Sequence, residues 1–259
     1  MTAAPEPLPV MPTLRLDGQR ALVTGAGRGI GLAAAAALAE AGAHVTLAAR
    51  TAADVEAAAA ALRSAGRQAE SLVLDVRDTA SVRAALADRE PCDVLVNNAG
   101  GNQPGPFVEA TEEAFDAVMG LNVRAAYFVA QAFVRRLVAV GRPGAIINVS
   151  SQMGHVGAVG RTIYCTSKHA LEGLTKALAV ELAPHGIRVN SICPTFIETA
   201  MTKPYFEVES FRREVLGKIK LGRLGRPEDL MGAVVYLASP AAALVTGAAL
   251  LIDGGWTAE

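Results

Sequence analysis

The chain contains 259 residues, of which 51% are hydrophobic and 19% are charged, and its formal net charge is −1. This length can supply one large core, and the balanced charge gives no electrostatic reason to expect nucleic acid or an anionic membrane as a partner. The three cysteines are widely spaced and odd in number, which argues against a disulfide framework, so we expect a cytoplasmic protein. The four histidines show no metal-ligand spacing, and the sequence predicts no metal site.

The first 13 residues, MTAAPEPLPVMPT, are rich in proline and lack a charged start followed by a long apolar run. This composition predicts a disordered tail over residues 1–13 instead of a signal peptide. No composition break follows, so residues 14–259 are expected to form a single domain. No apolar stretch approaches the roughly 20 residues of a membrane span, and no membrane partner is expected.

Short apolar runs alternate with helical patterns along the rest of the chain. Helical segments such as LAAAAALAEAG end in a glycine that suits a C-cap. The alternation predicts an α/β fold, a Rossmann-type doubly wound sheet of seven parallel strands with helices on both faces. Ligands bind such sheets outside the carboxyl ends of the strands. The expected strands cover residues 21–25, 44–49, 70–76, 93–100, 145–151, 187–195 and 249–253.

The glycine-rich segment TGAGRGIG, residues 24–31, lies between the first expected strand and an alanine-rich helix. Its spacing fits T-G-x-x-x-G-x-G and does not fit G-x-G-x-x-G. Glycines let the backbone approach a pyrophosphate, which the helix N-terminus attracts, although tight packing alone can also require such a turn. The segment predicts cofactor contacts from Gly25, Arg28, Gly29, Ile30 and Gly31.

The end of the second expected strand separates NAD from NADP. An acidic residue there would bond the ribose 2′-hydroxyl, but the strand ends in Arg50, and no acidic residue follows before Asp54. Arg50 and Arg28 are placed to pair with a 2′-phosphate. The alternative is that both are solvated surface arginines. We predict NADP(H), with NAD as the second possibility.

Two further strand ends offer contacts to the same cofactor. Asp75 and Val76 follow the third strand near the expected adenine, where Asp75 can accept from the amino group or serve as a helix N-cap or turn residue. The segment NNAG follows the fourth strand and is either a cofactor wall or an asparagine-rich turn. Its cofactor contacts are expected from Asn98, Ala99 and Gly100.

The chemistry is expected at Ser151, Tyr164 and Lys168. Tyr164 and Lys168 are i and i+4 on an expected helix and share a face. An ammonium about 4 Å away would lower the pKa of a phenol from near 10 toward neutrality, where acid-base catalysis is efficient. The spacing alone usually means a tyrosine packed on a lysine stem. Ser151, at a strand end on the same edge, favours catalysis, because its hydroxyl can bond a substrate oxygen.

These motifs, with the terminal DGG, resemble the short-chain dehydrogenase/reductase family from about Leu14 to Trp256. The resemblance implies a nicotinamide cofactor and a homotetramer. It also implies a catalytic tetrad in which Tyr164 donates a proton, Ser151 holds the carbonyl oxygen, Lys168 lowers the phenol pKa and bonds the ribose, and Asn122 supports a water relay. The family's P-G-x-x-x-T appears with Thr195 in place of glycine, so cofactor contacts are implied for Pro194, Ile197 and Thr199.

A small polar substrate is expected between the catalytic residues and the stretch 196–226. Its contacts are predicted from Ser151, Gln152, His155, Arg161, Tyr164 and Phe196. Polar groups near the carbonyl suit a sugar, sugar acid or polyol, although His155 and Arg161 can instead face solvent.

Two other functions remain open. One is the reduction of 3-oxoacyl thioesters on a carrier protein, for which a basic patch, diluted by nearby glutamates, is available at Arg212, Arg213, Lys218, Lys220 and Arg223. The other is a cofactor-binding sensor without catalysis, which is expected to lose the serine, tyrosine or lysine that this chain keeps.

Overall fold

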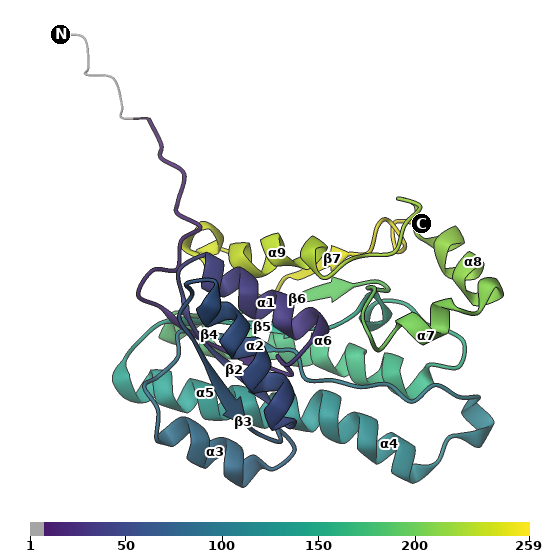
Figure 1. The fold of residues 1–259 in the computed structure, drawn as a ribbon, viewed down its shortest axis with the longest axis horizontal. Helices are drawn as coiled ribbons and strands as arrows, with labels where there is room; N and C mark the ends of the chain where they lie inside the picture. The colour runs from purple at the N-terminus through teal and green to yellow at the C-terminus, as the bar shows by residue number, and fades with distance from the viewer. Residues whose placement is uncertain (1–7) are drawn as a thin grey trace.

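The computed structural model describes residues 8–259, which form a seven-stranded sheet (Figure 1). The strands are β1 (Arg20–Thr24), β2 (His44–Ala49), β3 (Ala69–Val73), β4 (Val94–Asn97), β5 (Gly144–Val149), β6 (Ile187–Pro194) and β7 (Ala249–Ile252). Every pair is parallel, and the order is β3-β2-β1-β4-β5-β6-β7. The predicted fold class is confirmed. The third strand ends earlier than expected, so Asp75 and Val76 lie in the loop that follows it.

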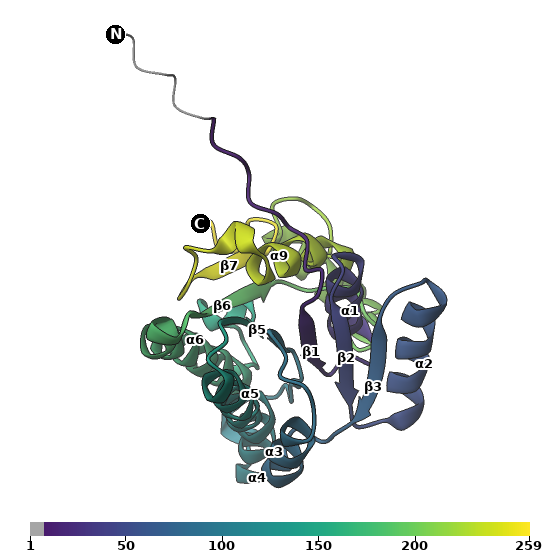
Figure 2. The ribbon, with the colours of Figure 1, turned by 90° about the vertical axis from the view of Figure 1, so that its left-hand side faces the viewer.

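Helices cover both faces of the sheet (Figure 2). The α-helices are α1 (Gly29–Glu40), α2 (Ala52–Ser64), α3 (Thr79–Ala87), α4 (Glu112–Met119), α5 (Ala126–Val140), α6 (Thr162–Leu182), α7 (Lys203–Phe206), α8 (Glu209–Lys218) and α9 (Glu228–Ala238). Short helical turns are η1 (Phe107–Glu109), η2 (Gly120–Ala125), η3 (Gln152–Gly154), η4 (Ala183–His185) and η5 (Pro240–Ala242). Helices α1, α2 and α9 pack on one face, and α3, α5 and α6 pack on the other.

Alternating side chains on the strands build the two halves of the core. On β1, Val23 packs in the half that contains α1 and α9, while Leu22 packs in the half that contains α3 and α5. Successive residues of a strand point to opposite faces. Because both faces are covered, the strands read as continuous apolar runs in the sequence.

The winding of the chain reverses between β1 and β4, which are neighbours in the middle of the sheet. The chain runs outward from β1 to β3 and then returns to β4 on the other side. In an open α/β sheet such a switch point leaves a crevice at the carboxyl ends of the strands. The loops after β1 and β4 therefore frame the place where a ligand is expected.

Of the predicted tail, residues 8–13 are exposed and form neither helix nor strand, and residues 1–7 lie outside the described part.

The continuous helical run Glu112–Val140 has 29 residues and is long and apolar enough to cross a membrane by length and composition alone. No such stretch was expected from the sequence. In the structure, Val129 and Phe133 of this run pack in the core beside α3, so its apolar face is used within the fold.

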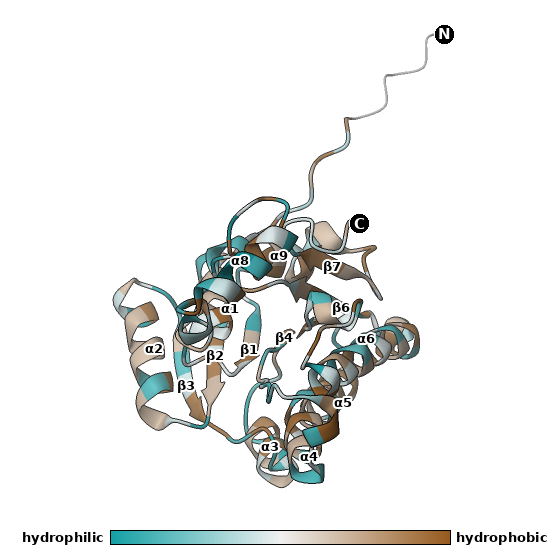
Figure 3. Cartoon of the chain, turned by 90° about the vertical axis from the view of Figure 1, so that its right-hand side faces the viewer, coloured by the Kyte–Doolittle hydropathy of each residue, from teal (hydrophilic) through white to brown (hydrophobic). Residues whose placement is uncertain are grey.

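The last strand forms an open edge of the sheet. Figure 3 shows β7 largely in hydrophobic colours and α8 largely in hydrophilic ones. Leu250 and Leu251 of β7 are 38% and 43% exposed. An exposed apolar edge strand is a surface that proteins usually cover.

Candidate active site

A cleft of about 430 Å³ opens at the carboxyl edge of the sheet. It gathers predicted residues from the loops that follow strands β1 to β6 and from α6. The predicted residues that line it are Gly25, Arg28, Gly29, Ile30, Gly31, Arg50, Val76, Asn98, Ala99, Gly100, Ser151, Gln152, Arg161, Tyr164, Lys168, Pro194, Phe196, Ile197 and Thr199. Asp75, Asn122 and His155 do not line it.

The glycine loop forms a tight cradle at the start of α1. A Cβ on Gly31 would lie 2.3 Å from the Gly25 carbonyl oxygen and 2.4 Å from Nδ2 of Asn98, so no side chain fits there. Gly25 and Gly29 adopt φ values of +64° and +58°, which residues other than glycine rarely adopt. The first amides of α1 are thereby presented to the cleft, where a phosphate would be bound.

Asn98 and Thr24 fix this cradle to the neighbouring strand. Asn98 Nδ2 donates to the carbonyl oxygens of Thr24 and Gly25 at 2.9 and 3.1 Å. The Thr24 hydroxyl accepts from the backbone amides of Asn98 and Ala99 at 3.0 and 3.1 Å. The NNAG segment is therefore both a wall of the cleft and a support of the glycine loop.

The far end of the cleft carries two exposed arginines, Arg28 and Arg50. This is the place predicted for a 2′-phosphate. Asp75 was expected at the adenine, but its carboxylate accepts a hydrogen bond of 2.7 Å from the Arg77 guanidinium, which holds the pKa of that carboxyl below its usual range. Leu74 and Val76 line the cleft on either side of Asp75. The structure therefore does not bring Asp75 into the cleft.

Tyr164 and Lys168 project from α6 to the base of the cleft. Lys168 Nζ lies 5.6 Å from the centre of the Tyr164 ring and donates to the Val149 carbonyl oxygen at 2.8 Å. Loss of hydration raises the pKa of Tyr164 to about 12, against a smaller opposing effect of Ser151. The expected fall of this pKa toward neutrality is wrong for the protein alone, because burial outweighs the neighbouring charges. A phenol in this state is a proton donor at neutral pH.

Burial acts on Lys168 as well, and lowers its pKa from 10.5 to about 8. Glu172, one helical turn away, opposes this fall less strongly. Lys168 is only 5% exposed, and a charged amine in such a place destabilises the folded state. A lysine at this position therefore lowers the stability of the folded state, as residues at functional sites commonly do.

We expect Lys168→Met to raise the free energy of unfolding at pH 7 by about 2 kcal/mol. Between pH 8 and 10.5 the unfolded lysine holds a proton that the folded one has lost, so the parent gains stability as pH rises through this window. The gain of the variant must therefore shrink toward pH 10. Urea unfolding of both proteins at pH 7 and pH 10 checks this. A gain that grows with pH would contradict it.

Ser151 stands at the end of β5, where the turn η3 begins. Its hydroxyl donates to Oε1 of Gln152 at 2.8 Å and accepts from the amide of Met153 at 3.1 Å. These bonds fix both side chains at the wall of the cleft. The structure thus brings Ser151, Tyr164 and Lys168 together, as predicted.

Asn122 lies behind the cleft, in the π-helical turn η2 between α4 and α5. It is 1% exposed, its Oδ1 accepts from the Gly101 amide at 2.8 Å, and its Nδ2 donates to the Gly101 carbonyl oxygen and to the Ser167 hydroxyl at 2.9 and 3.0 Å. Asn122 therefore ties α6 to the loop beside Lys168. No sequence pattern predicted the π-helical turn, a feature that is frequent at functional sites.

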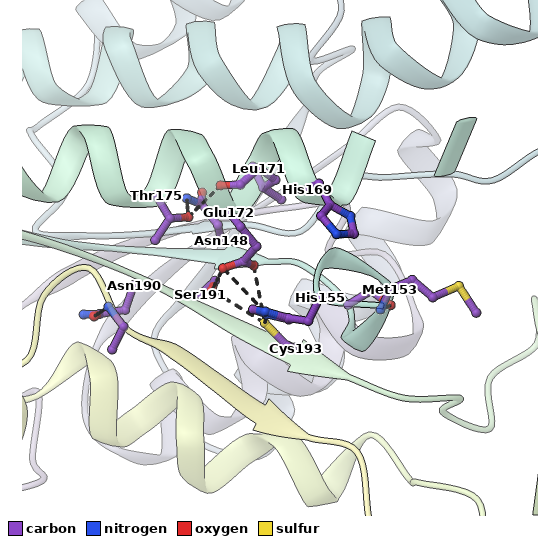
Figure 4. A network of polar contacts seen from close by, with 12 residues as sticks. Asn148, Met153, His155, His169, Leu171, Glu172, Thr175, Asn190, Ser191 and Cys193 are labelled. Atoms are coloured by element: carbon purple, nitrogen blue, oxygen red, sulfur yellow. Dashed lines mark hydrogen bonds and ion pairs between the residues drawn. The ribbon is translucent and has the colours of Figure 1, made fainter. Parts of the chain in front are cut away.

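His155 does not reach the substrate side, and its assignment there is wrong. The turn η3 directs it behind the cleft, where its Nε2 lies 3.4 Å from Sγ of Cys193 and 3.9 Å from the Glu172 carboxylate (Figure 4). The sequence placed His155 by its nearness to Ser151, and that nearness does not determine the direction of the chain after a 3₁₀ turn.

Four buried polar atoms of residues that line the cleft have no hydrogen-bond partner within residues 8–259: Oγ of Ser150, Nε2 of Gln152, Nη1 of Arg161 and Oγ1 of Thr195. Buried polar groups are normally bonded, so these atoms suit a polar ligand. The Arg161 guanidinium also lies over the Tyr205 ring at 5.8 Å. The sequence indicated Gln152 and Arg161, but Thr195 only as a departure from a motif.

Comparison with known proteins agrees with this geometry. The family model described as Enoyl-(Acyl carrier protein) reductase matches residues 25–257. An L-xylulose reductase of Mesocricetus auratus is 41% identical over 243 residues, which cover 94% of this chain and 98% of the reductase. A galactitol 2-dehydrogenase of Rhizobium johnstonii is 43% identical over 253 residues, with 94% and 96% covered. The crystal structure of a gluconate 5-dehydrogenase of Burkholderia cenocepacia, in complex with NADP and tartrate, has a TM-score of 0.91 and 36% identity, with 95% and 98% covered.

Proposed function

The chain belongs to the short-chain dehydrogenase/reductase family, and we propose that it is an NADP(H)-dependent oxidoreductase that interconverts a carbonyl and a secondary alcohol on a small sugar, sugar acid or polyol. The observation that carries this proposal is the meeting of Ser151, Tyr164 and Lys168 at the base of a cleft whose other end is a glycine cradle. The relatives are named as acting on xylulose, galactitol and gluconate, and these activities support the substrate class.

The cradle fits the cofactor. Gly31 leaves no room for a side chain against Gly25, so the backbone can approach a pyrophosphate, and Arg28 and Arg50 are in place for a 2′-phosphate. When bound, NADP(H) supplies or accepts the hydride. The further cofactor contacts that we propose are Ile30, Val76, Asn98, Ala99, Gly100, Pro194, Ile197 and Thr199. Asp75 is not among them.

The protein's own residues handle the proton. In reduction, Ser151 donates a hydrogen bond to the carbonyl oxygen and stabilises the negative charge that develops there. Tyr164 donates its phenolic proton to the same oxygen, and its pKa of about 12 keeps that proton in place at neutral pH. Lys168, charged below about pH 8, stabilises the phenolate that remains. Asn122 holds the adjoining loop in position.

A sugar acid fits the cleft wall best among the three substrate types. Nη1 of Arg161 and Nε2 of Gln152 are buried donors without partners among the described residues. A guanidinium suits a carboxylate, with which it forms two parallel hydrogen bonds. The tartrate in the related gluconate 5-dehydrogenase is itself a hydroxy acid. Arg161 is therefore proposed to anchor a substrate carboxylate.

We expect Arg161→Met to raise KM for keto-sugar acids by about 10- to 100-fold, which is the loss of one charge-assisted hydrogen bond. KM for neutral keto-sugars should change far less. The check is NADPH oxidation with matched acidic and neutral substrates, with Arg124→Met as a control for the loss of an arginine away from the cleft. An equal loss on both substrate classes would mean that Arg161 only supports the fold.

Reduction of carrier-bound thioesters is less well supported, although the matching family model carries that description. Four of the five basic residues that could receive an acidic carrier are already ion-paired with acids. The pairs are Arg213–Glu209, Lys218–Glu214, Lys220–Glu259 and Arg223–Asp229. An acetoacetyl thioester in the same assay separates the two functions. A sensor without catalysis is disfavoured because the serine, tyrosine and lysine are all in place.

We also propose a homotetramer in the cytoplasm. The apolar edge of β7, with Leu250 and Leu251 partly exposed, supports burial against another copy. The three cysteines are free thiols, which fits a reducing compartment.

A further inference from the structure

A second polar centre lies behind the catalytic wall and takes no part in the proposed reaction. Ser191 and Cys193 share one face of β6, and α6 crosses that face with Glu172 (Figure 4). Glu172 is 5% exposed and Cys193 is fully buried. The turn η3 brings His155 onto the same point from the end of β5. Three segments that are distant in the sequence thus place an imidazole, a carboxylate and a thiol together.

The distances between these donor atoms are close to those of a tetrahedral metal site. His155 Nε2 lies 3.4 Å from Cys193 Sγ and 3.9 Å from Glu172 Oε2, and Cys193 Sγ lies 3.4 Å from Glu172 Oε1. With Zn–S bonds of about 2.3 Å and Zn–N or Zn–O bonds of about 2.0 Å, tetrahedral donors lie about 3.3–3.6 Å apart. The His155–Glu172 distance exceeds this spacing, and Glu172 meets the other two donors with different oxygens, so the imidazole and the carboxylate must rotate to close the site.

The charge of the centre also calls for a cation. A buried carboxylate needs a charged partner or a metal, and within residues 8–259 Glu172 has no lysine or arginine at ion-pair distance, only His155. Ser150, which also lines the cleft, adjoins this centre: it is 3% exposed, and its hydroxyl lies beside Cys193.

We propose that His155, Glu172 and Cys193 form a binding site for Zn²⁺ that fastens the η3 turn to α6 and β6. Binding replaces the thiol proton of Cys193, which is released to the buffer. Ser191, whose hydroxyl donates to Glu172 Oε2 at 2.9 Å, orients the carboxylate. The His155 side chain is 29% exposed and gives the ion an entry path. No ligand spacing is visible in the sequence because each ligand comes from a different segment.

The test is titration of the full chain, stripped with a chelator, with Zn²⁺ and with Co²⁺. One ion per chain should bind, and Co²⁺ should show a thiolate charge-transfer band with the intense visible absorption of tetrahedral coordination. Cys193→Ser should abolish that band. His155→Gln, at an accessible position where folding is not at risk, should weaken Zn²⁺ binding by more than about 100-fold. Loss of a residue that only supports a ligand weakens metal binding by roughly 10- to 100-fold.

His169→Gln is the matched control. His169 is an exposed histidine on α6, the helix that carries Glu172, and its Nδ1 faces the Cys165 carbonyl oxygen. It should bind both metals as the parent does. Zn²⁺ should also raise the melting temperature of the parent and of His169→Gln, but not that of His155→Gln. Equal Zn²⁺ affinity in the parent, Cys193→Ser and His155→Gln, or a Co²⁺ complex without a thiolate band, would overturn the proposal.

Discussion

Replacement of Tyr164 by phenylalanine is expected to lower kcat for carbonyl reduction by about 10²- to 10⁴-fold, the usual contribution of a general acid. The variant keeps the aromatic ring on α6 beside Lys168 and removes only the hydroxyl that gives up the proton. Affinity for NADPH should stay close to that of the parent, because the cradle at Gly25 and Gly31 is untouched. Stopped-flow oxidation of NADPH and fluorescence titration of the cofactor measure the two quantities.

Tyr127→Phe serves as the matched control for this variant. Tyr127 lies on α5, is 46% exposed and does not line the cleft, so its loss of a hydroxyl should leave turnover unchanged. If Tyr164→Phe turned over at the parental rate, another group would have to supply the proton. A parallel loss of NADPH binding would instead indicate damage to the cleft.

Replacement of Arg50 by aspartate is expected to reverse the preference for NADP over NAD. A charge-assisted bond to the 2′-phosphate contributes about 1.5–3 kcal/mol, and a carboxylate in its place adds repulsion. The ratio of kcat/KM for NADP to that for NAD should therefore fall by about 100-fold or more. The new carboxylate at the end of β2 can also accept from the 2′-hydroxyl of NAD. Steady-state kinetics with both cofactors measure the ratio.

Arg67→Asp makes the same change of charge at a site remote from the cofactor. Arg67 is exposed just before β3, at the amino end of the sheet, whereas the cleft lies at the carboxyl end. Its cofactor ratio should equal that of the parent. An unchanged ratio in Arg50→Asp would reject the role given to Arg50 and leave Arg28 as the remaining candidate.

Motifs at strand ends predicted much of the cleft, because the carboxyl ends of parallel strands lie at one edge of the sheet even when the strands are far apart in the sequence. Gly31, Asn98, Ser151 and Lys168 each follow or face the carboxyl end of a strand, and the sheet order brings them to one edge. Local motifs do not predict the direction of a side chain that follows a sharp turn. After the 3₁₀ turn η3, His155 points behind the cleft.

Other features depend on tertiary burial, which no local pattern contains. The phenol pKa of Tyr164 rises because the cleft wall removes water, although the i,i+4 lysine suggested a fall. Asp75 follows its strand as expected, yet its carboxylate accepts a hydrogen bond from the neighbouring Arg77 and does not reach the cleft. The π-helical turn that seats Asn122 has no sequence signal of its own.

The proposed reaction requires a substrate carbonyl held between Ser151 and the hydroxyl of Tyr164. A crystal structure of Tyr164→Phe with NADPH and a keto-sugar acid tests this most directly, because the variant should trap the unreacted complex. We expect the carbonyl oxygen within about 3.2 Å of the Ser151 hydroxyl, facing the ring at position 164, with the carboxylate on Arg161. A carbonyl bound elsewhere in the cleft, away from both Ser151 and position 164, would contradict it.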